Sequence, residues 1–122
     1  MTDITSRQDL ELLMGHFYSS LLEDPEIRPI FTDIAKVDLT AHLPIIVDFW
    51  EQALFGKGTY RNNTLAIHQQ LHQKAELTAQ NFKTWLSCFD SAVDANFKGP
   101  MAEKIKTRAL SIATIMQIKI HS

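Results

Sequence analysis

Apolar side chains recur every three to four residues along nearly the whole chain, and the alternating pattern of a strand is absent. The first such stretch begins after Ser6, with Asp9 three residues further on, as in a capping box. It ends near Asp24, and its apolar stripe consists of Leu10, Leu13, Met14, Phe17 and Leu21. The spacing predicts an amphipathic helix and, repeated along the chain, an all-α fold in a single domain over residues 1–122.

Two further helices are expected before the middle of the chain. Asp24 can cap a short helix that has Pro25 in its first turn. This helix would carry Ile27, Ile30 and Phe31. A longer helix is predicted from about Asp38 to Leu54, where Pro44 removes one backbone hydrogen bond and should kink or delay the first turn. The glycine-containing segment 56–63 is predicted to be a loop.

Three more helices are predicted in the second half of the chain. A short, weakly hydrophobic helix is expected over Thr64–Gln73, and Thr78 then caps a long one. The apolar positions of that long helix are Phe82, Trp85, Leu86, Phe89, Ala92, Val93 and Phe97. Gly99-Pro100 ends it and begins the last helix. The residues expected to be buried on the last helix are Met101, Ile105, Ala109, Ile112, Met116 and Ile120.

Composition and charge exclude several classes of protein. Of the 122 residues, 45% are apolar and 21% are charged, as in a folded globular domain rather than a disordered one. The formal net charge of −2 provides no field that would attract a nucleic-acid backbone. The polar N-terminus lacks the apolar core of a signal peptide, and no run approaches the roughly 18 to 20 apolar residues of a membrane span. Together with a single cysteine, Cys88, these features favour a cytoplasmic protein.

Three histidines lie among apolar residues of the predicted helices, namely His42, His68 and His72. An unprotonated imidazole can ligate iron or zinc, and His68 and His72, four residues apart, can face the same way on a helix. Solvated or core histidines would explain the same spacing, which is common and non-specific. A zinc-protease motif would need a glutamate directly after the first histidine, where this chain has Gln69.

Aromatic residues are more numerous on certain faces than a small helical bundle requires, and they are Phe17, Tyr18, Phe31, Phe49, Trp50, Phe82, Trp85 and Phe89. Simple core packing explains Phe82 and Phe89. Tyr18 and Trp85 differ, because a buried O–H or N–H needs a hydrogen-bond partner. An apolar pocket with a few polar groups is the kind of site that holds a small polar ligand on a metal.

Several groups of residues form an ordered set along the chain. They are Leu13-Met14-Gly15-His16-Phe17-Tyr18 with Asp24-Pro25 and Pro29-Ile30-Phe31; His42 with Asp48-Phe49-Trp50; His68-Gln69-Gln70-Leu71-His72 with Leu77-Thr78; and Asn81-Phe82-Lys83-Thr84-Trp85-Leu86 with Phe89, Val93-Asp94, Phe97, Gly99 and Ala102-Glu103. Over nearly the whole chain this set resembles the truncated haemoglobins, most closely their group III branch. The resemblance implies a shortened globin fold, in which two helix pairs sandwich haem b.

The resemblance also assigns roles to individual residues. His72 takes the position of the proximal iron ligand, with His68 as the alternative. Tyr18, His42 and Trp85 fall at the distal positions, beside the bound ligand. The residues that the resemblance places around the haem are Phe31, Ile46, Phe49, Trp50, Leu71, Phe82 and Phe89.

The chain departs from the family pattern near the distal histidine. The family usually has a lysine three residues after that histidine, near a haem propionate, whereas this chain has Ile45 beside Pro44. Arg61 and Lys74 are the candidate substitutes for the propionate contact. We expect His42 to be a gate residue that points to solvent, with direct ligation of ferric iron as the alternative.

A pocket of this kind would bind O2, NO, CO, cyanide or similar small ligands. Two donors, Tyr18 and Trp85, would hold oxygen tightly, which suits nitric oxide oxidation, a peroxidase-like reaction or sensing better than delivery. A reductase would then be a partner, and the chain would be a monomer or a weak dimer. The alternatives without haem are a helical protein-interaction module and a helical zinc protein. The weakly apolar stretch 64–78 argues against the interaction module, because it needs an anchor such as an iron–histidine bond.

Overall fold

Helices and the turns between them make up the described chain, in a computed structural model that covers residues 1–34, 39–56 and 77–120. The elements are α1 (Arg7–Leu21), the π-helix η1 (Ile30–Ile34), α2 (Leu39–Phe55), α4 (Ala79–Asn96) and α5 (Pro100–Ile120). No strand occurs within those ranges, so the all-α prediction is confirmed. The short helix expected over Thr64–Gln73 lies outside the described residues.

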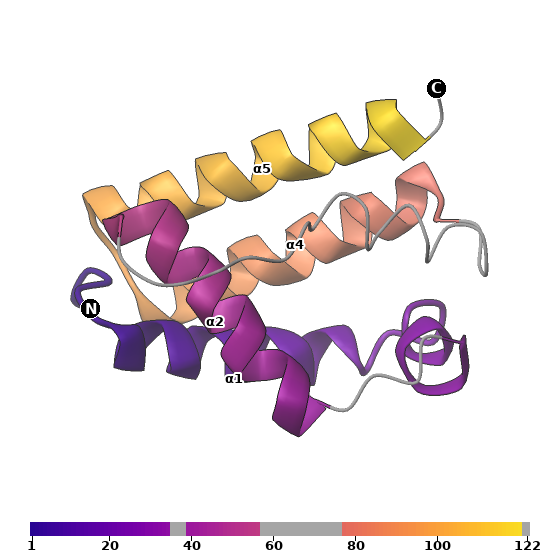
Figure 1. The fold of residues 1–122 in the computed structure, drawn as a ribbon, viewed down its shortest axis with the longest axis horizontal. Helices are drawn as coiled ribbons and strands as arrows, with labels where there is room; N and C mark the ends of the chain where they lie inside the picture. Colours follow the sequence, from indigo (N-terminus) through magenta and orange to yellow (C-terminus); the bar gives the residue numbers. More distant parts are fainter. Residues whose placement is uncertain (35–38, 57–76, 121–122) are drawn as a thin grey trace.

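The helices are arranged as two pairs (Figure 1). α1 packs against α2, and α4 packs against α5, while the pairs meet where α1 contacts α4 and α2 contacts α5. α4 and α5 are antiparallel neighbours because only residues 97–99 connect them. This is the expected two-over-two arrangement. None of the helices in the described ranges combines the length and the apolar character needed to cross a membrane.

Two helices begin at the capping residues that the sequence indicates. Ser6 Oγ accepts a hydrogen bond from the amide of Asp9 at 3.4 Å. Thr78 Oγ1 accepts from the amide of Asn81 at 3.1 Å, and the Asn81 side chain accepts from the amide of Thr78 at 3.0 Å, which closes a capping box. Asp9 does not close such a box, because its carboxylate accepts from the amide and the hydroxyl of Thr5 instead.

The segment after α1 starts as predicted and then departs from a regular helix. Asp24 Oδ1 accepts hydrogen bonds from the amides of Glu26 and Ile27, at 2.9 and 3.1 Å, as a cap does. The turn that it begins continues into the π-helix η1 rather than into a regular short helix. Ile27 is buried there, while Ile30 and Phe31 are half-buried.

Two other boundaries differ from the expectation. α2 begins at Leu39 and continues through Pro44, so the proline does not delay the start of the helix. The hydrogen bond that Pro44 cannot donate is lost inside the helix instead. Phe97, expected as the last apolar residue of the long helix, is its C-cap in an extended conformation, with φ −140° and ψ 156°. Its side chain is nevertheless buried, so the sequence predicted the burial of Phe97 correctly but not its backbone conformation.

The core consists of two clusters of buried side chains. The larger one joins α1, α2, α4 and the first half of α5, and the smaller one consists of Leu77, Phe82, Ala113 and Met116. Trp85, Leu86 and Ile112 are half-buried and pack against both clusters. On α5, Ile105, Ala109 and Met116 are buried as predicted, whereas Met101 and Ile112 are only half-buried. The side chain of Ile120 lies outside the description.

The first residues of the chain cap the last helix. The carboxylate of Asp3 accepts hydrogen bonds from the amides of Met101 and Ala102, each at 2.9 Å, at the N-terminus of α5. Gly99, with φ 145°, leaves room for this contact, because a Cβ at that position would lie 2.6 Å from Cγ of Asp3. Burial raises the pKa of Asp3, but hydrogen bonds from three backbone amides together lower it by more. The pKa of Asp3 therefore lies below its ordinary value.

Replacing Asp3 with alanine should lower the free energy of unfolding by about 1–2 kcal/mol, the usual cost of losing a helix cap. Because the pKa of Asp3 is lower in the folded chain, this stabilisation is present above the unfolded-state pKa and is lost as the pH falls through the folded-state pKa. Urea unfolding near neutral pH and at about pH 2 would measure it. Glu26→Ala, which removes an exposed carboxylate, is the control. An Asp3→Ala deficit of the same size at both pH values would contradict the prediction.

Candidate functional site

Seven aromatic side chains and one histidine meet where four elements converge, and we call this set the aromatic cluster. It consists of Phe17 and Tyr18 on α1, Phe31 on η1, His42, Phe49 and Trp50 on α2, and Trp85 and Phe89 on α4. Neighbouring rings have centroids 4.9 to 5.9 Å apart, and the contacts form one connected chain. Tilted and edge-on contacts at these separations are the favourable geometries for aromatic rings. The cluster therefore holds α1, η1, α2 and α4 together.

Tyr18 and His42 form a polar pair within the cluster. The Tyr18 hydroxyl lies 3.1 Å from Nε2 of His42, so either the phenol donates to a neutral Nε2 or Nε2–H donates to the phenol oxygen. Tyr18 is only 6% exposed. This burial raises the pKa of the phenol far above its ordinary value, so it stays a neutral group. The hydrogen bond directs the half-buried His42 inward, which corrects the expectation that it points to solvent.

Phe17 lies between the two predicted donors. Its wholly buried ring contacts Tyr18 at 4.9 Å and Trp85 at 5.7 Å between centroids. Trp85 also stacks on Phe89, with an interplanar angle of 19°. Tyr18 and Trp85 thus approach the same ring from α1 and α4. The sequence placed Phe17 in the apolar stripe of a helix and among the excess aromatic residues but indicated no specific role for it, although its position next to Tyr18 was a signal for one.

The other residues expected to line the site divide between the two core clusters. Ile46 and Phe49 are half-buried and pack against the larger cluster, and Phe89 is buried inside it. Phe82 is buried in the smaller cluster instead. Ile45 is 40% exposed, so it is not part of the core. The larger cluster thus contains half-buried rings and aliphatic side chains whose apolar surface the core does not fully cover.

The predicted iron ligand lies outside the described residues. This holds for His72, for the alternative His68 and for Leu71, and equally for Arg61 and Lys74. These assignments stay predictions. Over residues 1–34, 39–56 and 77–120, no three His, Cys, Asp or Glu side chains are grouped as ligands of a metal ion.

An ion-pair network fixes α2 on α1, and sequence reasoning did not predict it. Arg7 Nη1 on α1 lies 2.7 Å from Oδ1 of Asp48 and 3.2 Å from Oε1 of Glu51, both on α2. These groups are partly exposed, so the network contributes little free energy. It does set the position along α1 of the helix that carries His42. The residues are 41 and 44 positions apart in the sequence, which left no local signal.

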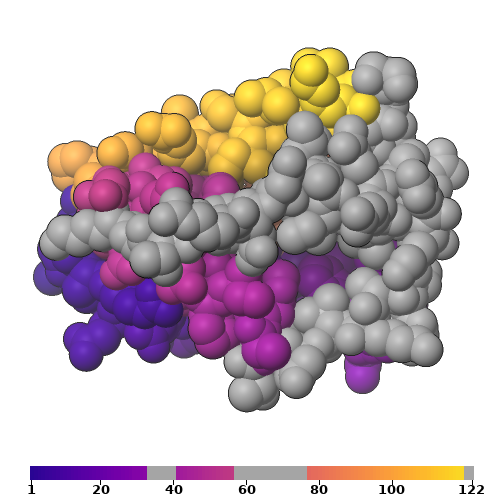
Figure 2. All heavy atoms as spheres, viewed as in Figure 1, coloured from indigo at the N-terminus to yellow at the C-terminus, as the bar shows by residue number. Residues whose placement is uncertain are grey.

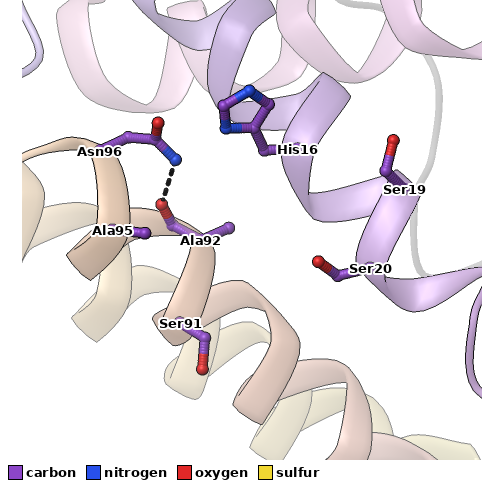
Figure 3. A pocket seen from close by; sticks show the side chains of 7 residues that line it. All are labelled: His16, Ser19, Ser20, Ser91, Ala92, Ala95 and Asn96. Carbon is purple, nitrogen blue, oxygen red and sulfur yellow. Dashed lines mark hydrogen bonds between the residues drawn. The ribbon is translucent and has the colours of Figure 1, made fainter.

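A cavity of about 420 Å³ lies away from this site, between α1 and α4 (Figure 3). It is lined by His16, Ser19, Ser20, Ser91, Ala92, Ala95 and Asn96. Its side chains are small and mostly exposed, and the amide of Asn96 already donates to the carbonyl of Ala92 at 2.8 Å. None of the predicted site residues lines it. The aromatic cluster, with its buried phenol, is the better candidate for a binding site.

Comparisons with known proteins agree on one family. A family model described as "Bacterial-like globin" matches residues 2–121. The group 3 truncated hemoglobin ctb of Campylobacter jejuni is 26% identical over 119 residues, which are 95% of this chain and 91% of that protein.

Solved structures give the same answer. The group III truncated hemoglobin from Campylobacter jejuni has a TM-score of 0.86 at 26% identity, with coverage of 98% of this chain and 95% of that one. The group II truncated hemoglobin from Bacillus anthracis has a TM-score of 0.75 at 30% identity, covering 93% and 85%. A truncated haemoglobin from Bacillus subtilis, described as oxygen-avid, has a TM-score of 0.75 at 25% identity, covering 91% and 92%. The resemblance found in the sequence is confirmed.

The raised pKa of Tyr18 predicts how the chain responds to alkali. In a Tyr60→Phe variant, in which Tyr18 is the remaining tyrosine, tyrosinate absorbance should appear only as the protein unfolds. Because the unfolded chain releases the phenol proton more readily, stability should fall as the pH rises past about 10, the ordinary pKa of a tyrosine phenol. Absorbance and circular dichroism recorded in one alkaline titration measure both. A tyrosinate signal near the ordinary pKa with the helices intact would contradict this.

Proposed function

Since the chain belongs to the bacterial-like globin family, we propose that it binds haem b and uses it for oxygen and nitric oxide redox chemistry rather than for oxygen delivery. Membership of the family implies a haem cofactor and small diatomic ligands such as O2. The observation that carries the rest is the buried phenol of Tyr18, hydrogen-bonded to His42 inside the aromatic cluster.

The described residues suit a flat apolar group with a polar ligand beside it. Phe31, Phe49 and Trp85 are half-buried, so they offer ring surface to a further apolar partner. The Tyr18 hydroxyl and the His42 imidazole are joined by a hydrogen bond of 3.1 Å, and the ring of Phe31 contacts that of Tyr18. Apolar walls with a few convergent polar groups are typical of cofactor sites.

We assign the iron to His72. This residue precedes Phe82 by ten positions and Trp85 by thirteen, which is the family's spacing for the proximal histidine, and both of these residues lie on α4. His72 would hold the haem iron, which when bound would supply the site for a diatomic ligand. The remaining contributions are those of the chain, which excludes water with its aromatic side chains and supplies hydrogen-bond donors.

Tyr18 and Trp85 are the donors in this proposal. The phenol stays protonated because burial raises its pKa, and the indole N–H does not ionise, so both can donate at any physiological pH. A hydrogen bond to a polar ligand in an apolar pocket contributes roughly 1–3 kcal/mol. A stabilisation of about 2 kcal/mol slows ligand escape roughly thirtyfold.

Slow release suits retention of oxygen for a reaction, and it fits poorly with delivery. The Bacillus subtilis structure to which the chain is similar is described as oxygen-avid, which supports tight binding here. We therefore place nitric oxide oxidation, with a reductase that returns the iron to the ferrous state, first among the activities. A cytoplasmic location follows from the same proposal.

The first test is the binding of haem. The purified chain titrated with hemin should develop a strong Soret band, and the ferrous form should be five-coordinate through His72. His72→Gly should lose this coordination and regain it when free imidazole is added, because imidazole can occupy the cavity left by the side chain. His68→Gly is the matched control and should behave as wild type. A chain that stays colourless, or a His72→Gly variant with unchanged ferrous spectra, would overturn the assignment.

The second test addresses the donors. Tyr18→Phe and Trp85→Leu should each raise the oxygen dissociation rate, by roughly tenfold to a hundredfold for the loss of one hydrogen bond. Stopped-flow mixing of the oxygenated ferrous protein with excess CO measures the rate. Ser19→Ala, which removes an exposed hydroxyl next to Tyr18 on α1 and outside the aromatic cluster, should leave it unchanged. Equal rates in wild type and both donor variants would refute the donor roles.

A further inference from the structure

Charge is distributed unevenly along the chain. Residues 104–122 contain Lys104, Lys106, Arg108 and Lys119 and no acidic side chain. Residues 1–103 carry the other 8 basic side chains and all 14 acidic ones. The C-terminal segment therefore has a formal charge of +4 in a chain whose net charge is −2. Most of this basic segment is α5.

Between Thr107 and Ile118, the side of α5 that faces away from the core carries large aliphatic and hydroxyl side chains and no charge. Leu110, Ile115 and Ile118 are 56%, 53% and 63% exposed, although the opposite side of the helix is buried. With about 3.6 residues per turn, they share one side with smaller exposed residues. We call this side the outer face of α5, and it comprises Thr107, Leu110, Ser111, Thr114, Ile115 and Ile118. α5 runs along one edge of the molecule in both views (Figures 1 and 2).

Basic side chains border the outer face on the side of α2. Lys104, Arg108 and Lys119 share a helix flank by their spacing, and Nζ of Lys104 donates to the carbonyl of Leu54 on α2 at 3.2 Å. The other flank has no net positive charge. There Lys106 lies 2.7 Å from Asp94 and 3.1 Å from Glu103. The outer face is thus an aliphatic strip with positive charge along one border.

We propose that the outer face of α5 adsorbs to anionic lipid surfaces, a property separate from gas binding. A helix that lies on a membrane combines exposed aliphatic residues with flanking Lys and Arg. Anionic headgroups attract each basic residue near the surface strongly enough to raise binding about fivefold. Because only three large aliphatic side chains are exposed, the binding should be weak and reversible.

Two other occupants fit the face less well. A second copy of α5 in antiparallel contact would bring Arg108 close to Lys119, so like charges would repel. A specific protein partner would be expected to meet aromatic or methionine side chains at the centre of the interface. The outer face has Leu, Ile, Thr and Ser there. Lipid is the occupant that both the charge and the side-chain types favour.

Co-sedimentation of the full chain with vesicles tests the proposal. At low salt, the chain should sediment with equal parts of phosphatidylglycerol and phosphatidylcholine but not with phosphatidylcholine alone, and added salt should release it. Arg108→Gln should weaken partitioning about fivefold. The double variant Leu110→Ser, Ile118→Ser should weaken it roughly tenfold.

The matched controls are Lys83→Gln, an exposed basic residue on α4, and Leu12→Ser, an exposed leucine on α1, and both should bind as wild type does. Since all substituted side chains are exposed, circular dichroism should show folded variants. Equal sedimentation with both kinds of vesicle, or equal losses in the controls, would overturn the proposal. A third outcome would also overturn it. If the chain binds soluble polyglutamate as tightly as it binds vesicles, and the Leu110→Ser, Ile118→Ser variant binds polyglutamate equally well, the result indicates an acidic protein partner.

Discussion

The ring of Phe17 joins the two helix pairs. It is buried where α1 meets α4, with its centroid 5.1 Å from that of Phe89 and 5.7 Å from that of Trp85. Aromatic contacts of this kind contribute about 0.5–1.5 kcal/mol each beyond the burial of apolar area. The backbone of Phe17 also places the next residue, Tyr18, at the edge of the same cluster. Phe17 therefore contributes both to the packing of the two helix pairs, through its ring, and to the position of the Tyr18 phenol, through its backbone.

That phenol imposes a second constraint. A buried hydroxyl without a partner costs roughly 1–3 kcal/mol, and His42 supplies the partner from another helix. The contact depends on where α2 lies along α1, which Arg7 helps to fix through Asp48 and Glu51. The ion pairs add little stability because they are partly exposed. Their importance is in alignment, since a shift of α2 by one turn would separate His42 from Tyr18.

Helix caps formed by residues close together in the sequence could be predicted, whereas contacts between residues far apart in the sequence could not. The caps at Ser6 and Thr78 involve partners three residues away, and both were predicted. Asp3 caps α5 across 98 and 99 positions, and no pattern in the sequence indicates that pairing. Pro44 was expected to kink or delay the first turn of α2; the start is not delayed, because the burial of helix residues such as Trp50 outweighs one lost backbone hydrogen bond.

The candidate site divides in the same way. Composition and spacing identified Tyr18 and Trp85 as polar groups in need of partners, but only the family resemblance linked them to His42. The structure then placed the phenol 3.1 Å from the imidazole, 24 positions along the chain. Phe17 was named among the aromatic residues, but its contacts with Tyr18 and Trp85 were not predicted, because a buried phenylalanine in a helix stripe looks the same whether or not it supports a site. The ligand assignment to His72 rests on spacing and family.

α5 illustrates how one helix can serve two environments. Its inner face has alanines at 102, 109 and 113, whose small side chains let α4 approach closely, while its outer face keeps large aliphatic residues in solvent. α1, which carries Tyr18, packs on α2 and α4 and lies across the molecule from α5 (Figure 1). A surface that held the outer face of α5 would therefore leave α1, which carries Tyr18, on the far side. The two proposed activities, adsorption and ligand binding, would then not compete for the same surface.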